Sequence, residues 1–198
     1  MSEMNRQVMD FVDNLGDRTH TVIFYENLEY ARAIEYRYIK LGLLNGENCV
    51  FTTHEDDADE IEKEMSDFGI DVDRFKEKGM LIVLKIKDPR AHSEGLAGGI
   101  EHLRKQLWTE QSSSIRIVTR FIKKVENTEE KEANMFVERM VHAAFERFPH
   151  SVMCPYPVED IKSMIDGEWM QNHLRNHHAA FFVFKNGKGL ALELPTSS

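Results

Sequence analysis

The chain has 198 residues, of which 41% are hydrophobic and 30% charged, and its formal net charge is −9 at pH 7. These values are typical of one globular domain with a sizeable core. The acidic balance argues against nucleic acid or an anionic membrane as the main partner. Two cysteines are too few for a disulfide framework, and no apolar run approaches the ~18 residues of a membrane span. We therefore expect a cytoplasmic protein that associates with neither nucleic acid nor membrane.

Strand-like and helix-like patterns alternate along the chain. Residues 1–17 are predicted to contain a separate amphipathic helix, and residues 18–198 a single domain. Strands are predicted where apolar and β-branched residues run together, and helices where apolar residues recur at three- and four-residue spacing. The expected strands are 22–25, 49–53, 80–86, 115–121 and 151–154. The expected helices are 4–15, 28–44, 56–68, 72–78, 100–110, 128–148 and 158–176, the last with a break at Gly167.

Some local signals qualify this pattern. Residues 87–99 contain three glycines and are expected to form an irregular, mobile cover. Pro155 and Pro157 are expected to stop the fifth strand, and Asn186-Gly187 predicts a closing hairpin. The whole pattern predicts an α/β fold with three layers: a mostly parallel sheet, helices on both faces and a C-terminal antiparallel hairpin. In the helix over 128–148, apolar residues recur every four positions, at Phe136, Met140, Ala144 and Phe148.

The connector after the first strand, Tyr25-Glu26-Asn27, lies where a nucleotide-hydrolysing α/β protein carries a glycine-rich loop. A phosphate cradle needs open backbone N–H groups and a lysine. This connector has neither glycine nor lysine, and Glu26 would repel a phosphate. No G-x-S-x-G nucleophile motif is present either. These features favour a binding or sensing module without ATPase activity.

Ligands of open parallel sheets bind beyond the carboxyl ends of the strands. The residues at the expected ends combine aromatic, thiol and hydrogen-bonding groups, which suits a small, partly apolar organic ligand. For any one of them, however, an ordinary polar residue at a strand end is the more probable interpretation, and Arg120 could equally form a structural ion pair. The residues at these ends are Tyr25, Glu26, 52–54, 85–87, Arg120, Cys154 and Tyr156.

A metal site is a competing interpretation of the histidines and cysteines. His173 and His177 are four residues apart, so they would share one face of a helix, as zinc ligands often do. Since neither C-x-x-C nor H-E-x-x-H is present, solvated histidines near a helix end are the favoured interpretation. Cys49 and Cys154 fall in strands and are interpreted as core residues. We predict no cofactor and no metal, with a metal- or thiol-dependent enzyme built on both cysteines and the C-terminal histidines as the alternative.

Two family resemblances appear in particular motifs. Residues 38–84 resemble the segment after the P-loop in the KaiC branch of RecA-type ATPases, although the nucleotide-binding loop and the Walker B aspartate do not carry over. Residues 18–194 resemble the MEDS domain, the methanogen/methylotroph sensory domain. The matching motifs are H-x-x-x-F-Y-E at 20–26, L-x-N-G-E-x-C ending at Cys49, C-x-Y-P at 154–157, and an N-H that places either His177 or His178 in register.

The MEDS resemblance implies a KaiC-like derivative without ATPase function that senses small hydrocarbon derivatives. We therefore expect a non-catalytic sensory domain with a small organic ligand at the strand carboxyl ends, signalling through a protein partner or a homo-oligomer. An oligomerising adaptor is a further alternative. Aromatic walls, polar orienting groups and a polarizable thiol lining are expected from the ligand-binding set His20, Tyr25, Glu26, Cys49, Arg120, Cys154, Tyr156 and His177.

Overall fold

The computed structural model describes residues 3–54, 57–107, 114–144, 150–161 and 166–195. Within these ranges, seven strands form one sheet in the order β3-β2-β4-β5-β1-β6-β7. Neighbouring strands are parallel except for the final pair, β6 and β7, which are antiparallel. The strands are β1 (His20–Tyr25), β2 (Asn48–Thr53), β3 (Leu81–Lys85), β4 (Ile115–Val118), β5 (His150–Pro157), β6 (Ala179–Val183) and β7 (Gly189–Glu193).

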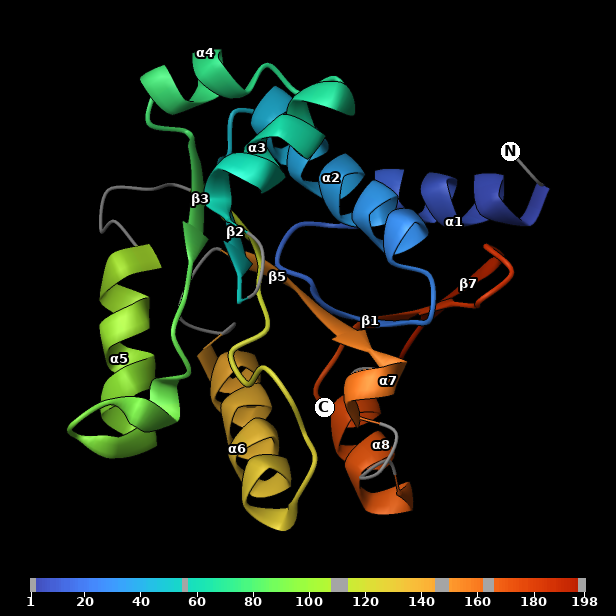
Figure 1. Ribbon diagram of the computed structural model, residues 1–198. Helices are drawn as coiled ribbons and strands as arrows, with labels where there is room; N and C mark the ends of the chain where they lie inside the picture. The colour runs from blue at the N-terminus through green and yellow to red at the C-terminus, as the bar shows by residue number, and fades with distance from the viewer. Residues whose placement is uncertain (1–2, 55–56, 108–113, 145–149, 162–165, 196–198) are drawn as a thin grey trace.

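Helices cover both faces of the sheet (Figure 1). One face carries α1 (Glu3–Asp13), α2 (Leu28–Leu44), α3 (Ala58–Asp67) and α4 (Val72–Glu77). The other face carries α5 (Gly95–Leu107), α6 (Thr128–Ala144), α7 (Val158–Ile161) and α8 (Gly167–Arg175). The short 3₁₀ helix η1 (Pro89–Ala91) precedes α5. The predicted three-layer α/β fold with a mostly parallel sheet is therefore confirmed.

The apolar runs in the strands follow from this double covering. In β1, Ile23 packs in the cluster under α1–α4, whereas Val22 and Phe24 pack in the cluster under α5–α8. A strand buried on both faces needs apolar residues at consecutive positions, so it reads as a continuous rather than an alternating run. The two clusters are the two halves of the core.

β5 is longer than predicted, because it continues through Pro155 and Pro157, which pair with β1. The backbone N of Thr119 donates to Met153 O at 3.0 Å, so residue 153 directs its backbone polar groups toward β4. Residues 155 and 157 face the same side, beyond the last pairing of β4 with β5 at Val118. A proline is tolerated where its missing N–H would face no neighbouring strand.

The stretch over 87–99 is also more regular than predicted. It contains η1 and the first turns of α5, so the expected irregular cover is wrong for most of its length. Gly99 explains why a glycine is needed there: a Cβ added to it would lie 2.1 Å from the carbonyl oxygen of Pro89. Gly99 therefore permits close packing of α5 against η1.

α6 turns a different face to the core from the one suggested by its four-residue repeat. Phe136 and Met140 are partly exposed, at 38% and 39%. The buried apolar residues are Ala133, Val137 and Val141. Phe148 and the side chain of Ala144 lie outside the part of the chain that the structure describes. The buried stripe of α6 also carries two polar residues, which belong to the site described below.

The first helix and the last strand pack together. α1 packs against α2 and β7, with Val8 and Val12 buried and the ring of Phe11 edge-on to Phe181 at 5.5 Å. The predicted hairpin forms between β6 and β7, with Gly187 at φ 71° in its turn. Among the described helices, none has the length and apolarity required to span a bilayer.

Candidate functional site

The structure separates the eight residues expected at one ligand site into four places. His20, Cys154, Tyr156 and His177 lie together on the α5–α8 face. Tyr25 and Arg120 line a pocket at the strand carboxyl ends. Glu26 accepts a hydrogen bond from the backbone N of Lys185 near the hairpin, and Cys49 is buried on the opposite face. His20 begins β1 and His177 precedes β6, so both lie toward the amino ends of parallel strands rather than at their carboxyl ends.

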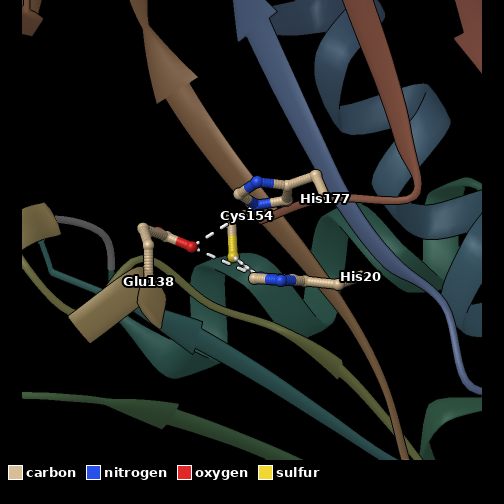
Figure 2. Close-up of side chains that lie close together, drawn as sticks. All are labelled: His20, Glu138, Cys154 and His177. Atoms are coloured by element: carbon tan, nitrogen blue, oxygen red, sulfur yellow. Dashed lines mark hydrogen bonds and ion pairs between the residues drawn. The ribbon is translucent and has the colours of Figure 1, made fainter. Parts of the chain in front are cut away.

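Four side chains converge beneath α6, and we call them the His/Cys/Glu cluster (Figure 2). They are His20 from β1, Glu138 from α6, Cys154 from β5 and His177 from the segment before β6. The Nε2 atom of His20 lies 3.3 Å from Cys154 Sγ and 3.3 Å from Glu138 Oε2. The Nε2 atom of His177 lies 3.4 Å from the same oxygen. All four residues are buried, and one ligand atom from each lies within 4.8 Å of the others.

Backbone carbonyls fix both imidazole rings of the cluster. Nδ1 of His20 lies 2.6 Å from the carbonyl oxygen of Asn176, and Nδ1 of His177 lies 2.6 Å from that of His173. A carbonyl oxygen only accepts, so each Nδ1 is the donor, and Nε2 of a neutral ring is then an acceptor. Nε2 of His177 and Oε2 of Glu138 have no hydrogen-bond partner among the described residues. The cluster therefore places two buried polar atoms next to each other without satisfying either one by a hydrogen bond.

A chain of hydrogen bonds holds the other carboxylate oxygen of Glu138. The hydroxyl of Tyr156 donates to Glu138 Oε1. Asn134 Nδ2 donates to that hydroxyl at 2.7 Å, and Trp169 Nε1 donates to Asn134 Oδ1 at 3.0 Å. All four residues are buried. This arrangement orients the carboxylate so that Oε2 faces the imidazoles.

The charges of the cluster follow from burial and proximity. Burial, assisted by the neighbouring His177, lowers the pKa of His20 to about 3, so this ring is neutral at pH 7. Burial and the nearby Glu138 raise the pKa of the Cys154 thiol well above its usual value. Burial would raise the pKa of Glu138, but its contacts with His177 and His20 outweigh burial and hold that pKa well below its usual value. The carboxylate is thus ionised inside a dry core.

The C-terminal histidines correct one prediction from the sequence. His173 and His177 were expected to be solvated, yet their exposed fractions are 0% and 1%. The ring of His173 packs on that of Trp169 with centroids 3.6 Å apart. Sequence reasoning also missed Glu138, whose burial is indicated by its place next to Val137 on the stripe of α6 that contains Val141. A carboxylate on an apolar stripe is the signal that could have found it.

A second site candidate is the carboxyl-end pocket, with a volume of about 110 Å³. It contains two ion pairs, each with an N–O distance of 2.9 Å: Arg32 with Glu35, and Arg120 with Asp160. The two interpretations weighed for Arg120, pocket residue and ion-pair partner, both hold. Burial raises the pKa of Tyr25, so its hydroxyl stays protonated. The remaining lining residues are Leu28, Thr52, Thr53, His54, Pro155 and Pro157.

A larger hollow of about 370 Å³ lies between β3, η1 and α5 and is lined partly by Leu84, Ile86, His102 and Leu103. It lies at the carboxyl end of the edge strand β3 alone, and we call it the β3–α5 hollow. In the described residues it shares no lining residue with the carboxyl-end pocket.

Cys49 has a structural role on the α1–α4 face. Its Sγ lies 3.5 Å from the carbonyl oxygen of Ile39, and burial raises the pKa of its thiol. A Cβ added to Gly42 would lie 2.8 Å from this sulfur, so the helix α2 approaches the strand closely at that point. The prediction of a core cysteine fits Cys49 better than the expectation of a ligand contact.

The topology and the pocket define a class: a three-layer α/β domain with a mostly parallel sheet, whose strand carboxyl ends bear charged and aromatic side chains in place of a phosphate-binding glycine loop. A KaiC-like protein from the hyperthermophilic archaeon Pyrococcus horikoshii OT3 has a similar structure, with a TM-score of 0.61 and 14% sequence identity. The match covers 91% of this chain and 81% of that one, and it confirms the KaiC-like fold. No curated protein matched the chain.

Residues 19–178 match the family described as MEDS, the methanogen/methylotroph, DcmR sensory domain. The match spans most of the chain, so this protein belongs to the MEDS family, and its role is sensory.

Proposed function

We propose that this sensory domain binds a small organic molecule in the carboxyl-end pocket and transmits the occupancy of that pocket to a protein partner. The observation that carries the proposal is the position of the pocket. It lies over the carboxyl ends of β1, β2 and β5, where open parallel sheets bind their ligands.

The size and chemistry of the pocket restrict its ligand. A volume of about 110 Å³ accommodates only a few non-hydrogen atoms, well below the ~300 Å³ of an ordinary drug-sized site. Tyr25, Leu28 and Pro157 supply apolar surface, while Thr53 and the two ion pairs supply polar groups. These two cations and two anions cancel, so the pocket does not favour a triphosphate. A small, weakly charged organic compound with one polar end fits best.

The ion pairs suggest how binding would be transmitted. The pair of Arg120 with Asp160 joins the segment after β4 to α7, and the pair of Arg32 with Glu35 lies within α2. Burial raises the pKa of Glu35 despite the opposing attraction of Arg32, so this carboxylate is sensitive to a new neighbour. A ligand that hydrogen-bonds to either pair would shift the population between two positions of α7 or α2.

The test begins with native mass spectrometry of protein taken directly from cells, which reports any small molecule it retains. Small alcohols, amines, acids and halogenated hydrocarbons are then screened by ligand-observed NMR. With the best binder as probe, Tyr25→Ala and Arg120→Gln should each weaken binding by about tenfold or more, since each removes a wall or a charged hydrogen bond.

The matched control is His102→Ala, which alters the β3–α5 hollow and leaves the carboxyl-end pocket intact. Binding that is lost in His102→Ala but kept in the two pocket variants would place the ligand elsewhere. Micromolar binding of a fluorescent ATP analogue, lost in Arg120→Gln, would overturn the choice of ligand class.

A further inference from the structure

We propose that the His/Cys/Glu cluster is a binding site for one divalent transition-metal ion, with zinc the best match. The ligand atoms are Nε2 of His20, Nε2 of His177, Sγ of Cys154 and Oε2 of Glu138. This inference goes beyond the proposed function, because none of these residues lines the carboxyl-end pocket.

The distances within the cluster match a tetrahedral site. Zinc bonds of about 2.0–2.3 Å imply separations between neighbouring ligand atoms of roughly 3.3–3.8 Å in a regular tetrahedron. The three separations between an imidazole Nε2 and its neighbours are 3.3, 3.3 and 3.4 Å, and every pair of ligand atoms lies within 4.8 Å. The remaining pairs, which lie within 4.8 Å, would contract into this range when the ion binds.

The donor types select the metal. Two imidazole nitrogens and a thiolate suit a borderline-soft ion such as Zn²⁺, and they disfavour Mg²⁺ and Ca²⁺, which prefer oxygen ligands. An ionised Cys154 and Glu138 would together balance the charge of the divalent ion. The loaded site would therefore be neutral, which removes the large cost of burying a net charge.

The supporting contacts are those of a metal centre. Ligating histidines usually donate their second ring N–H to a carbonyl or carboxylate, which fixes the tautomer. Here Nδ1 of His20 and of His177 each donates to a backbone carbonyl at 2.6 Å. Tyr156 holds the second oxygen of Glu138, so the carboxylate is oriented to bind through Oε2 alone.

A simple buried ion pair explains the cluster less well. One protonated imidazole is enough to neutralise Glu138, yet a second imidazole lies beside the same oxygen and the thiol of Cys154 lies 3.3 Å from Nε2 of His20. The rings of His20 and His177 are stacked with centroids 3.8 Å apart, an arrangement that disfavours positive charge on both rings at once. A shared cation accounts for all four groups at once.

The four ligands would leave no open coordination position, which is the pattern of a structural rather than a catalytic zinc site. They come from both ends of the domain, since His20 and His177 lie 157 positions apart in the chain. An ion held there would tie α6 to β1, β5 and the start of β6.

The first experiment uses the full-length wild-type chain. Metal is first removed with a chelator, and the protein is then titrated with Co²⁺. We expect the absorption bands of tetrahedral Co²⁺ and a thiolate-to-metal charge-transfer band, both saturating at one Co²⁺ per chain. X-ray absorption of the zinc-loaded protein should show one sulfur at about 2.3 Å and three nitrogen or oxygen atoms at about 2.0–2.1 Å. Zinc bound only to nitrogen and oxygen, or no equimolar binding, would overturn the proposal without any variant.

The variants use the second buried cysteine as a matched control. Cys154→Ala should abolish the charge-transfer band, whereas Cys49→Ala, on the opposite face of the sheet, should retain it. Glu138→Gln should weaken zinc binding at least about tenfold while the far-UV circular dichroism is unchanged. Loss of the band in Cys49→Ala but not in Cys154→Ala would refute the assignment.

Discussion

The two faces of the sheet each bury a cysteine beside a charged network, but the networks differ in how their hydrogen bonds are satisfied. On the α1–α4 face, Arg116 donates to both carboxylate oxygens of Glu47, at 2.6 and 3.2 Å, and to the carbonyl of Tyr38 at 3.1 Å. On the α5–α8 face, the oxygen Oε2 of Glu138 lies 3.3 Å from Nε2 of His20 and 3.4 Å from Nε2 of His177, and Cys154 Sγ lies 3.3 Å from Nε2 of His20.

This difference distinguishes a purely structural network, that of Arg116 and Glu47, from one that could bind a cation, the cluster at Glu138. The pair of Arg116 and Glu47 supplies its own donors, and the guanidinium also lies over the ring of Tyr38 at 4.6 Å. The cluster at Glu138 leaves Oε2 of Glu138 and Nε2 of His177 buried without a hydrogen-bond partner among the described residues, which is the condition in which a buried site attracts a cation. Residue composition alone would not distinguish the two networks, because each contains a carboxylate, a cysteine and at least one basic side chain.

The largest effect is expected on the structural face. Arg116→Ala leaves Glu47 as a buried unpaired charge, so the free energy of unfolding should fall by about 3–5 kcal/mol. Urea denaturation measures it, and the double variant with Glu47→Gln should recover part of the loss. Equal instability of the single and double variants would show that packing, not the charge, dominates at this site.

Acid should act mainly on the histidine face. Burial lowers the pKa of His173 to about 4. Between pH 6.5 and pH 4, this imidazole is therefore protonated in the unfolded chain but neutral in the folded chain. Stability from this group is complete above pH 6.5 and declines as pH falls toward 4, by roughly 3 kcal/mol.

His173→Phe keeps an aromatic ring on Trp169 and removes the titration. The unfolding free energy of the variant, measured by urea denaturation at pH 7 and pH 4, should fall less than that of the wild type. Parallel pH profiles would show that His173 is not responsible for the acid loss.

A smaller effect is expected from the hydrogen-bond chain behind Glu138. Tyr156→Phe removes the donor to Oε1 and should lower the unfolding free energy by about 1–3 kcal/mol. Zinc affinity should fall by about 10–100-fold, because the carboxylate loses its orientation. Calorimetric titration measures the affinity, and an unchanged affinity with lowered stability would confine Tyr156 to a role in packing.

The smallest effect compares the two cysteines directly. In chelated protein, Cys49→Ala and Cys154→Ala should each cost about 1 kcal/mol or less, since each removes one buried sulfur atom. After zinc is added, the wild type and Cys49→Ala should rise in Tm while Cys154→Ala should not. Thermal unfolding followed by circular dichroism measures these Tm values. An equal rise in Tm in both variants would show that Cys154 binds zinc no more than Cys49 does.

Much of the fold was predictable because strands buried on both faces consist of continuous apolar residues, as at 80–86, and because Asn186-Gly187 indicates a hairpin. The length of β5 was not predictable, because a strand can continue through Pro155 only where the neighbouring strand β4 has already ended. The cluster was predicted only in part: His20, Cys154 and His177 were singled out, but as contacts of an organic ligand at the strand carboxyl ends. Burial of the imidazoles depends on carbonyls such as Asn176 O, 156 residues from His20, which no local pattern reveals.

The prolines of β5 have a consequence for the carboxyl-end pocket, which Pro155 and Pro157 line. Where two neighbouring strands such as β4 and β5 diverge, further backbone hydrogen bonds between them would extend the pairing and close the gap. On this side of β5, residues 155 and 157 can donate none, whatever side chains occupy 119–121. Only the carbonyls of these two residues can still bond to the facing segment, so the covalent structure of β5 disfavours closure of the pocket mouth whatever residues that segment carries.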